Sequence, residues 1–467
     1  MPRSPQLWTL ILGFAVLHMV LAASIPVFED EAYYQLWASA PSAAYYDHPP
    51  MVAWFIAAGQ GLLGQTLLGL RLVSILAGIA VSLMIYRITW LYAQNEQTAF
   101  RAVLFGKAML PFSILAFAAT PDAGSVLFWT ASVWALVEVV KGGSKNWWLL
   151  VGLFAGLGVL SKFTNLFLGL SLVIWLLASR EGRARLKVWQ VWLGAIIGAA
   201  VLVPLALWNF ENNFVGLERQ FGRIEEVSEF SAGHFVAFLL SVIFLITPLL
   251  FWLVFRAFRQ TPTPKIFIWL IAPIFLFLTW QATKSVAGGQ WLIPIFPLLA
   301  VLAALSAPKN WATRWAAPTG MIFGAIILIL GLWPGKSLLG GHFFSQMRGW
   351  PDIHRQVLTI AKDEGATWVA TDAYGLTAQL NHYLGADIPV WSVTQPERYL
   401  FRTGARKELC TQRAVFISRT RFAEAPPYFE NGKALPDIFR KDGERKLMQY
   451  YVAVVSGPTE EHPYFCR

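Results

Sequence analysis

Four carboxylates and one histidine occupy a short part of the chain that contains no lysine or arginine. Between residues 27 and 66, three acids follow one another, Glu29-Asp30-Glu31, and the pair Asp47-His48 comes next. The residues around them are mainly aromatic, proline and alanine. Carboxylates held against apolar surroundings have raised pKa values and tend to be functional. A solvated acidic loop is the alternative interpretation.

A fifth acid and three cations occupy isolated positions further along the chain. Asp122 lies in the tight turn 120–123 between two apolar runs. An acid at the end of a membrane span is a functional candidate, or it caps the helix that follows. The cations are Arg71, Lys162 and Lys284. Isolated cations beside a lipid phase bind phosphate or extend to lipid headgroups.

These residue types are the ones that a membrane-embedded sugar transferase with a lipid-phosphate donor needs. A carboxylate takes the proton of the acceptor hydroxyl. Cations, or a divalent metal held by carboxylates, stabilise the leaving phosphate. An apolar groove would hold the prenyl tail of the donor.

The composition places these residues in a polytopic helical membrane protein. Of 467 residues, 56% are hydrophobic and 14% are charged, against roughly 25% charged in soluble domains. This excludes a disordered protein, a disulfide scaffold and an ordinary cytosolic enzyme. The net charge of +10 comes largely from short basic clusters between apolar runs. Such clusters are typical of cytoplasmic loops and do not indicate a nucleic-acid partner.

Eleven apolar runs are candidates for membrane spans, since a span needs about 20 apolar residues. An odd number of spans puts the tail outside if the N-terminus is inside. The first run could also be a signal peptide cleaved near residues 21–24, and the next loop would still face outward. Glycine pairs at 152 and 156 and at 194 and 198 predict close helix contacts. The runs are 6–27, 67–91, 100–119, 123–140, 147–160, 163–179, 189–209, 235–255, 266–282, 290–306 and 315–333.

We therefore expect a transmembrane domain over residues 1–334 and an extracytoplasmic soluble α/β domain over 335–467. Within loop 28–66, residues 32–40 and 51–63 predict short helices lying in the membrane interface. In the tail, helical stretches alternate with β-like runs, which favours a partly parallel sheet. Cys410 and Cys466 could pair in an oxidising compartment or stay as buried thiols. The tail's helical stretches are 352–364 and 376–384, and its β-like runs are 367–371, 390–393, 414–418 and 450–455.

Segments 28–34 and 45–51 resemble the first outer loop of the GT-C membrane glycosyltransferases. Among these glycosyltransferases, the sequence is similar to the bacterial relatives of the protein O-mannosyltransferases and of the aminoarabinose transferase that acts on lipid A. Its Asp-His-Pro-Pro form is similar to transferases that add galacturonic acid to lipopolysaccharide. The resemblance continues through Arg71-Leu72, residues 120–123 and 158–164, and Trp208-Asn209 with Phe214 and Gln220.

The resemblance implies a polyprenyl-phosphate sugar donor and transfer, normally with inversion, on the outer side of the bacterial inner membrane. The acceptor would be lipid A, lipopolysaccharide or another envelope glycan or lipid. By position, Asp30 would be the catalytic base, with Glu31 and Asp122 supporting it. These three acids are also the candidate ligands for Mg, Mn or Zn.

The same resemblance assigns the donor phosphate to a second set of residues. Many relatives have lysine at the position of His48, and a histidine titrates near pH 6.5, so phosphate neutralisation falls to the isolated cations or to a metal. The implied phosphate set is Asp47, His48, Arg71, Lys162 and Lys284, and the implied substrate cavity is lined by Tyr33, Tyr46, Trp208 and Asn209.

Two other functions share these features. A transporter or flippase of lipid-linked sugars predicts charged or broken helices near the bilayer midplane and internal repeats, and Lys107 is the main charge inside a span. An enzyme like the protein O-mannosyltransferases would use the same donor with a polypeptide acceptor. Residues 211–233, which include Arg219, could line the acceptor cavity or form a solvated amphipathic helix.

Overall fold

The computed structural model describes residues 4–225, 230–259, 264–332, 345–402, 406–422, 426–459 and 466. The chain forms two compact units, and each contains two separate segments. The helical unit contains residues 1–23 and 47–328, and the sheet unit contains residues 24–46 and 329–467. The chain leaves the sheet unit between Tyr46 and Asp47, inside the acidic loop. The expected domain boundary at 334 and 335 lies outside the described residues.

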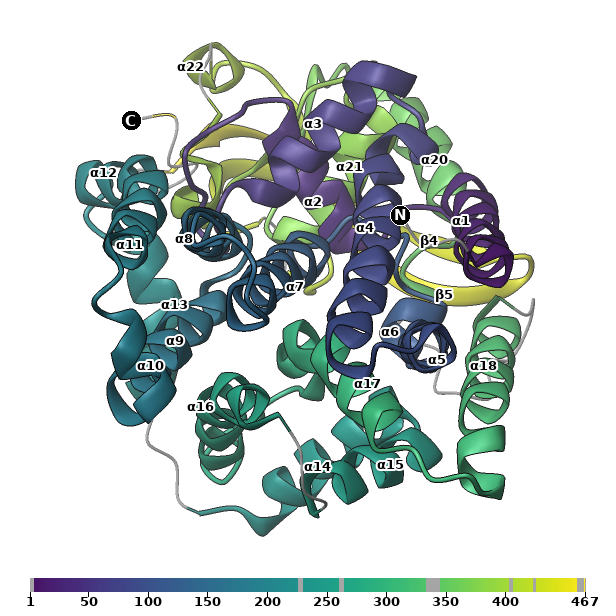
Figure 1. The fold of residues 1–467 in the computed structure, drawn as a ribbon. Helices are drawn as coiled ribbons and strands as arrows, with labels where there is room; N and C mark the ends of the chain where they lie inside the picture. The colour runs from purple at the N-terminus through teal and green to yellow at the C-terminus, as the bar shows by residue number, and fades with distance from the viewer. Residues whose placement is uncertain are drawn as a thin grey trace. The chain divides into compact units, whose positions relative to one another are not determined.

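The helical unit is an apolar bundle whose core includes side chains of α4, α5, α7 and α17. Figure 1 labels these four helices. Its last helix, α18, runs past residue 328. Its elements are α1 (Pro5–Ser24), α3 (Met51–Leu63), α4 (Leu67–Ala93), α5 (Glu96–Ala108), α6 (Leu110–Ser113), α7 (Pro121–Val140), α8 (Trp147–Val159), η1 (Phe163–Asn165), α9 (Leu166–Ala178), α10 (Arg180–Arg185), α11 (Trp189–Val201), α12 (Val203–Glu211), α13 (Val215–Glu225), α14 (Ala232–Ile246), α15 (Pro248–Arg259), α16 (Lys265–Gln281), η2 (Gly289–Ile295), α17 (Phe296–Leu305) and α18 (Trp311–Leu332).

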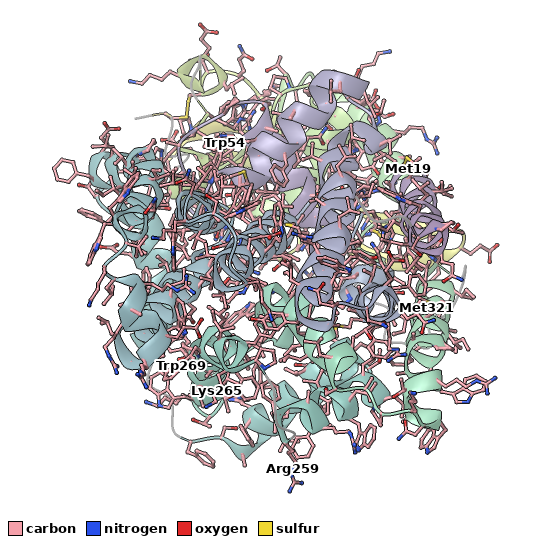
Figure 2. All side chains as sticks on the ribbon, viewed as in Figure 1. Met19, Trp54, Arg259, Lys265, Trp269 and Met321 are labelled. Atoms are coloured by element: carbon pink, nitrogen blue, oxygen red, sulfur yellow. A yellow bond between two sulfur atoms is a disulfide. The ribbon has the colours of Figure 1, made fainter. Side chains whose placement is uncertain are left out.

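Within the described residues, five helices are long and apolar enough to cross a membrane: α1, α4, α7, α18 and the continuous stretch of α11 and α12. The bent pair α14 and α15 would be a sixth. The other apolar helices are shorter, 10 to 17 residues, so helix length alone does not confirm eleven spans. Large apolar side chains such as Met19 of α1 and Trp54 of α3 are exposed, as lipid-facing side chains would be (Figure 2).

Two of the expected continuous spans are broken helices. The run 235–255 divides at Thr247, whose φ is 75°, and the two helices meet at 102°. The run 100–119 divides at Met109, which is extended, before the single turn of α6. Pro248 directly follows the break at Thr247, and proline disfavours helix in the residue that precedes it. Pro111 lies in the first turn of α6, after the break at Met109, and because proline has no backbone N–H it cannot donate the hydrogen bond that would continue α5.

The glycine pairs bring α8 and α11 into backbone contact, as the sequence predicts. A Cβ on Gly152 would collide with the carbonyl oxygen of Gly194. A Cβ on Gly156 would lie 2.6 Å from the carbonyl oxygen of Gly198. Only glycine allows such an approach.

The sheet unit combines helix α2 (Glu29–Ala38) of the acidic loop with a five-stranded sheet in the order β2-β1-β3-β5-β4. Strands β2, β1 and β3 are parallel, and β5 is antiparallel to both β3 and β4. Strand β4 is missing from the sequence prediction because its 14 residues are mostly exposed and include Gly432 and Pro436. The other elements are α20 (Trp350–Asp363), β1 (Trp368–Thr371), α21 (Tyr374–Leu384), β2 (Val390–Ser392), η3 (Pro396–Tyr399), α22 (Arg406–Leu409), β3 (Ala414–Ser418), β4 (Phe429–Asp442) and β5 (Arg445–Pro458).

Alternate residues of the sheet pack into two apolar clusters, as the period of two in a strand requires. Val369 and Val415 belong to the cluster that contains side chains of α20 and α21. Trp368 and Phe416 belong to the other cluster, against which Cys410 and Cys466 pack. These two cysteines form a disulfide, so of the two alternatives left open by the sequence, the structure has the pair.

Candidate functional site

Helix α2 begins in the acidic loop, and its three acids form its first turn. Carboxylates are favourable there because they complement the positive end of the helix dipole. Glu31 is fully buried, and its Oε2 accepts a hydrogen bond of 3.1 Å from the backbone N–H of Phe28, which precedes the helix. This is the backbone half of a capping box. Glu31 therefore stabilises the start of α2, whatever further role it has.

Asp30 and Glu29 point to two different partners in the sheet unit. Asp30 is exposed, and its Oδ1 accepts a hydrogen bond of 3.2 Å from the hydroxyl of Tyr374, at the start of α21. Glu29 forms an ion pair with Arg419, and its side chain is 14% exposed. The two neighbouring acids thus differ: one is accessible, and the other is held by a cation.

The aromatic residues of the loop fix its position within the sheet unit. The buried Tyr33 donates a hydrogen bond of 3.1 Å to the carbonyl oxygen of Arg398. The Arg398 guanidinium lies 4.4 Å from the ring centre of Tyr374 and 5.3 Å from that of Tyr46. Both residues predicted to line the cavity, Tyr33 and Tyr46, therefore pack around one arginine. Burial of Tyr45 raises the pKa of its hydroxyl to about 12.

In the helical unit, two predicted residues from separate turns form a pair. The Nζ of Lys162 lies 2.7 Å from Oδ1 of Asp122, and the side chains are 12% and 27% exposed. The N-cap of α7 is Thr120, and Asp122 lies inside the first turn, so the interpretation of Asp122 as the helix N-cap is wrong. The backbone N–H of Met51 donates to the carbonyl oxygen of Leu160 at 3.0 Å, which ties the start of α3 to this turn.

Asp47 forms an ion pair with a residue of α13, which lies in the segment 211–233 that could line the acceptor cavity or form a solvated amphipathic helix. Its Oδ1 lies 3.6 Å from Nε of Arg219, and its backbone oxygen accepts a hydrogen bond of 2.5 Å from Gln220. Both residues lie on α13, which is strongly amphipathic. Neither Arg219 nor Gln220 belongs to the donor-phosphate set predicted from the sequence. Gln220 is one of the residues that carry the resemblance to the GT-C glycosyltransferases, whereas the only sequence signal of Arg219 is a cation on an amphipathic helix.

Asn209 is buried and joins α12 to α13. Its Nδ2 donates to the carbonyl oxygen of Leu205 at 2.9 Å, and its Oδ1 accepts from the N–H of Leu217 at 3.2 Å. Its backbone oxygen accepts from the N–H of Phe214 at 2.7 Å. The contacts of Asn209 therefore hold the turn that places α13, while Trp208 beside it is partly exposed.

The remaining predicted cations lie at helix ends in different surroundings. Arg71, on α4, is fully buried, and its Nη1 donates to the carbonyl oxygen of Ala22 at 2.9 Å. Its guanidinium also lies 5.1 Å from the ring centre of Phe117. The Nζ of Lys284 lies 4.4 Å from the ring centre of Trp280. His48 is partly exposed beside Asp47.

The predicted metal ligands belong to different units: Asp30 and Glu31 to the sheet unit, and Asp122 to the helical unit. In the part of the chain that the structure describes, no three His, Cys, Asp or Glu side chains are close enough to hold a metal ion. A divalent metal on these acids stays a prediction, and no step of the chemistry below is assigned to it.

Comparison with known proteins gives matches by sequence and by fold. Residues 47–208 match the family of dolichyl-phosphate-mannose-protein mannosyltransferases. The chain is 24% identical over 455 residues to the lipid A galacturonosyltransferase RgtD of Rhizobium johnstonii, covering 92% of this chain and 94% of RgtD. It is 25% identical over 283 residues to the undecaprenyl phosphate-α-4-amino-4-deoxy-L-arabinose arabinosyl transferase 1 of Sodalis glossinidius, covering 56% of this chain and 49% of that protein.

A solved structure has a similar fold. ArnT from Cupriavidus metallidurans, bound to undecaprenyl phosphate, superposes with a TM-score of 0.67 at 16% identity, covering 96% of this chain and 98% of ArnT. The apo form of that ArnT gives a TM-score of 0.64. The chain therefore has the ArnT-like GT-C fold, which confirms the resemblance to GT-C membrane glycosyltransferases that its loop motifs indicate.

Proposed function

We propose that this chain is an integral membrane glycosyltransferase that moves a sugar from a polyprenyl phosphate to lipid A or a related envelope lipid. The observation that carries the proposal is the match to RgtD, a lipid A galacturonosyltransferase, over nearly the whole of both chains. The ArnT structure with undecaprenyl phosphate supports the class of donor. A hexuronic acid is therefore the first sugar to test.

The topology that we propose places the enzyme in the bacterial inner membrane with eleven spans. The five long helices and the bent pair supply six of them, and the shorter apolar helices supply the rest. Residues 335–467 would form an extracytoplasmic α/β domain. The disulfide between Cys410 and Cys466 supports this orientation, because disulfides persist in oxidising compartments.

Asp30 is the residue that we assign as catalytic base. It is exposed, so an acceptor hydroxyl can reach its carboxylate. As the acceptor oxygen bonds to the anomeric carbon, its proton passes to Asp30 and the bond from that carbon to the phosphate oxygen breaks. Attack from the face opposite the phosphate gives inversion.

The leaving polyprenyl phosphate gains negative charge and needs cations. Lys162 is our first candidate because Asp122 holds its ammonium at a fixed place without burying it completely. Arg219, held by Asp47, is the second candidate. Arg71 is buried against the end of α1, so we assign it a positioning role.

The test is a transfer assay with purified protein in nanodiscs, a synthetic polyprenyl-phosphate hexuronate and lipid A, read by mass spectrometry. Wild type should form glycosylated lipid A, and Asp30→Asn should form almost none. Asp352→Asn is the matched control, since Asp352 also lies in the first turn of a helix and should leave activity unchanged.

Three other results would overturn parts of the proposal. Wild-type turnover in Asp30→Asn would remove Asp30 from the role of base. Transfer to a serine- or threonine-containing peptide instead of lipid A would favour the protein O-mannosyltransferase alternative. Movement of the labelled donor across vesicles without product would favour the flippase.

Loss of activity in a chelator, restored by Mg, Mn or Zn, would establish the predicted metal.

A further inference from the structure

The sheet unit places one acid of the loop at the carboxyl ends of its parallel strands. Strand β3 ends at Ser418, and the next residue, Arg419, forms the ion pair with Glu29. Strand β1 ends at Thr371, followed by Asp372, whose Oδ2 accepts a hydrogen bond of 2.7 Å from the hydroxyl of Ser418. The segments after these two neighbouring strands are therefore tied together beside Glu29.

This location is where open α/β sheets usually bind ligands. The sheet order β2-β1-β3 means that the chain goes to one side of β1 and then to the other, and the crevice at such a reversal is the common binding position. Gly375, in the first turn of α21, borders it. A Cβ on Gly375 would lie 2.5 Å from Oε2 of Glu29. Here a carboxylate of the protein's own loop takes the place that an anionic ligand takes in other sheets.

Further contacts fix α2 along α21. The Nε2 of Gln379 donates to the carbonyl oxygen of Val27 at 3.1 Å, just before α2 begins. Near the end of α2, Oε1 of Gln35 lies 2.6 Å from Nδ1 of His382. With the Glu29–Arg419 pair, these contacts hold α2 at its start and near its end. The position of Asp30 in space therefore depends on contacts with residues more than 300 positions further along the chain.

We propose that Arg419 is a positioning residue for sugar transfer, acting on Asp30 through the carboxylate of Glu29. This inference rests on the proposed function, since it takes Asp30 as the base. Glu29 and Asp30 are consecutive in one helical turn, so a shift of the Glu29 side chain and backbone moves the base as well. A displacement of about 1 Å can cost about 100-fold in rate, whereas binding of the donor depends on other residues.

The experiment is a double-mutant cycle in the full-length protein in nanodiscs, with the same transfer assay. Glu29→Gln and Arg419→Gln should each lower kcat by about 10- to 100-fold and leave the donor KM unchanged. The double variant should be no slower than the slower single variant, because the second change removes a pair that is already broken. Hydrogen exchange of residues 29–38 should rise in each variant, while exchange of β1 and β3 stays as in wild type.

A third variant changes neither partner of the pair. Gly375→Ala adds only a methyl group, and alanine favours helix over glycine, but that methyl group would displace the Glu29 carboxylate. It should lower kcat without lowering the melting temperature. Gly169→Ala is its control, since a Cβ there meets nothing within 4 Å. Arg413→Gln is the control for Arg419, because Arg413 precedes the same strand at its opposite end.

The outcomes separate this inference from the proposed function. If wild type forms no product, the proposed function fails. If wild type is active and the Glu29, Arg419 and Gly375 variants keep its kcat, the positioning role fails alone. Additive losses in the cycle, or a fall in stability with unchanged exchange of residues 29–38, would show that Arg419 only stabilises the sheet unit. Should Arg419→Gln not fold, Glu29→Gln and Gly375→Ala decide the question.

Discussion

A substitution of Lys162 tests whether its ion pair with Asp122 belongs to an enzyme site or only stabilises the fold. Its ammonium lies 2.7 Å from the carboxylate of Asp122, and its side chain is 12% exposed. Methionine keeps most of the length and apolar stem of lysine and removes the charge. Lys162→Met therefore tests whether this charge serves the donor phosphate or only the fold.

The expected effect follows from the kind of contact that is lost. A hydrogen bond to a charged group contributes about 1.5–3 kcal/mol, which corresponds to about 10- to 150-fold in an equilibrium or rate constant. We expect kcat/KM for the polyprenyl-phosphate donor to fall by that factor. The loss of stability should be smaller, about 1 kcal/mol, because the pair is partly solvated.

The assay is steady-state transfer at varied donor concentration, together with thermal unfolding of each variant. Arg87→Met is the matched control, since Arg87 forms an ion pair with Glu138 at the same 2.7 Å in the same unit. It should lose stability and keep its kcat/KM. An unchanged kcat/KM in Lys162→Met, or an equal loss in Arg87→Met, would refute the phosphate role.

Two more predictions concern the sheet unit. Burial raises the pKa of Asp372, so the folded protein keeps this proton at pH values where the unfolded chain has released it. Stability then falls as the pH rises above about 4, the ordinary pKa of aspartate. Asp372→Asn should unfold at a higher temperature than wild type at neutral pH and at the same temperature near pH 4, and a lower temperature at neutral pH would contradict this. Changing Cys410 and Cys466 to serine should destabilise the unit by at most about 4 kcal/mol, since 56 residues separate them, and peptide mapping without reductant checks the link.

Local structure in the acidic loop was predictable from sequence, and its partners were not. Residues 32–40 and 51–63 read as helices, and the structure has α2 and α3 there. The patterns follow from neighbours a few residues apart. The contact between α2 and α21 joins residues separated by more than 300 positions. The periodicity of one segment does not predict which distant segment it contacts. Asp30 and Asp122 belong to different units, a division that no pattern in either segment predicts.

The same limit explains the errors in the predicted spans and the unpredicted contact between Asp122 and Lys162. Hydropathy over a window of about 20 residues averages across a break, so runs 100–119 and 235–255 read as continuous although Pro111 and Pro248 mark the divisions. Asp122 and Lys162 were each predictable as candidate site residues, but the contact between them was not. Both residues are scarce charges at the ends of apolar runs, but only the fold brings the two turns to 2.7 Å.

Asn209 shows how a predicted cavity residue can act at a distance. Its side-chain amide donates a hydrogen bond to the carbonyl oxygen of Leu205 on its own helix and accepts one from the N–H of Leu217 in the first turn of α13. Helix α13 contains Arg219, which forms the ion pair with Asp47. Asn209→Ala removes the acceptor of the half-buried Leu217 N–H, at a cost of about 0.5–1.5 kcal/mol, and loosens α13. We expect kcat/KM to fall as far as in Arg219→Gln, with no further loss when the two changes are combined. Asn212→Ala is the control, because the Asn212 side chain donates to the carbonyl oxygen of Trp208 on α12 and its backbone contact with α13 is kept in alanine. Equal effects of the two asparagine variants, or additive losses with Arg219→Gln, would mean that Asn209 does not act through α13.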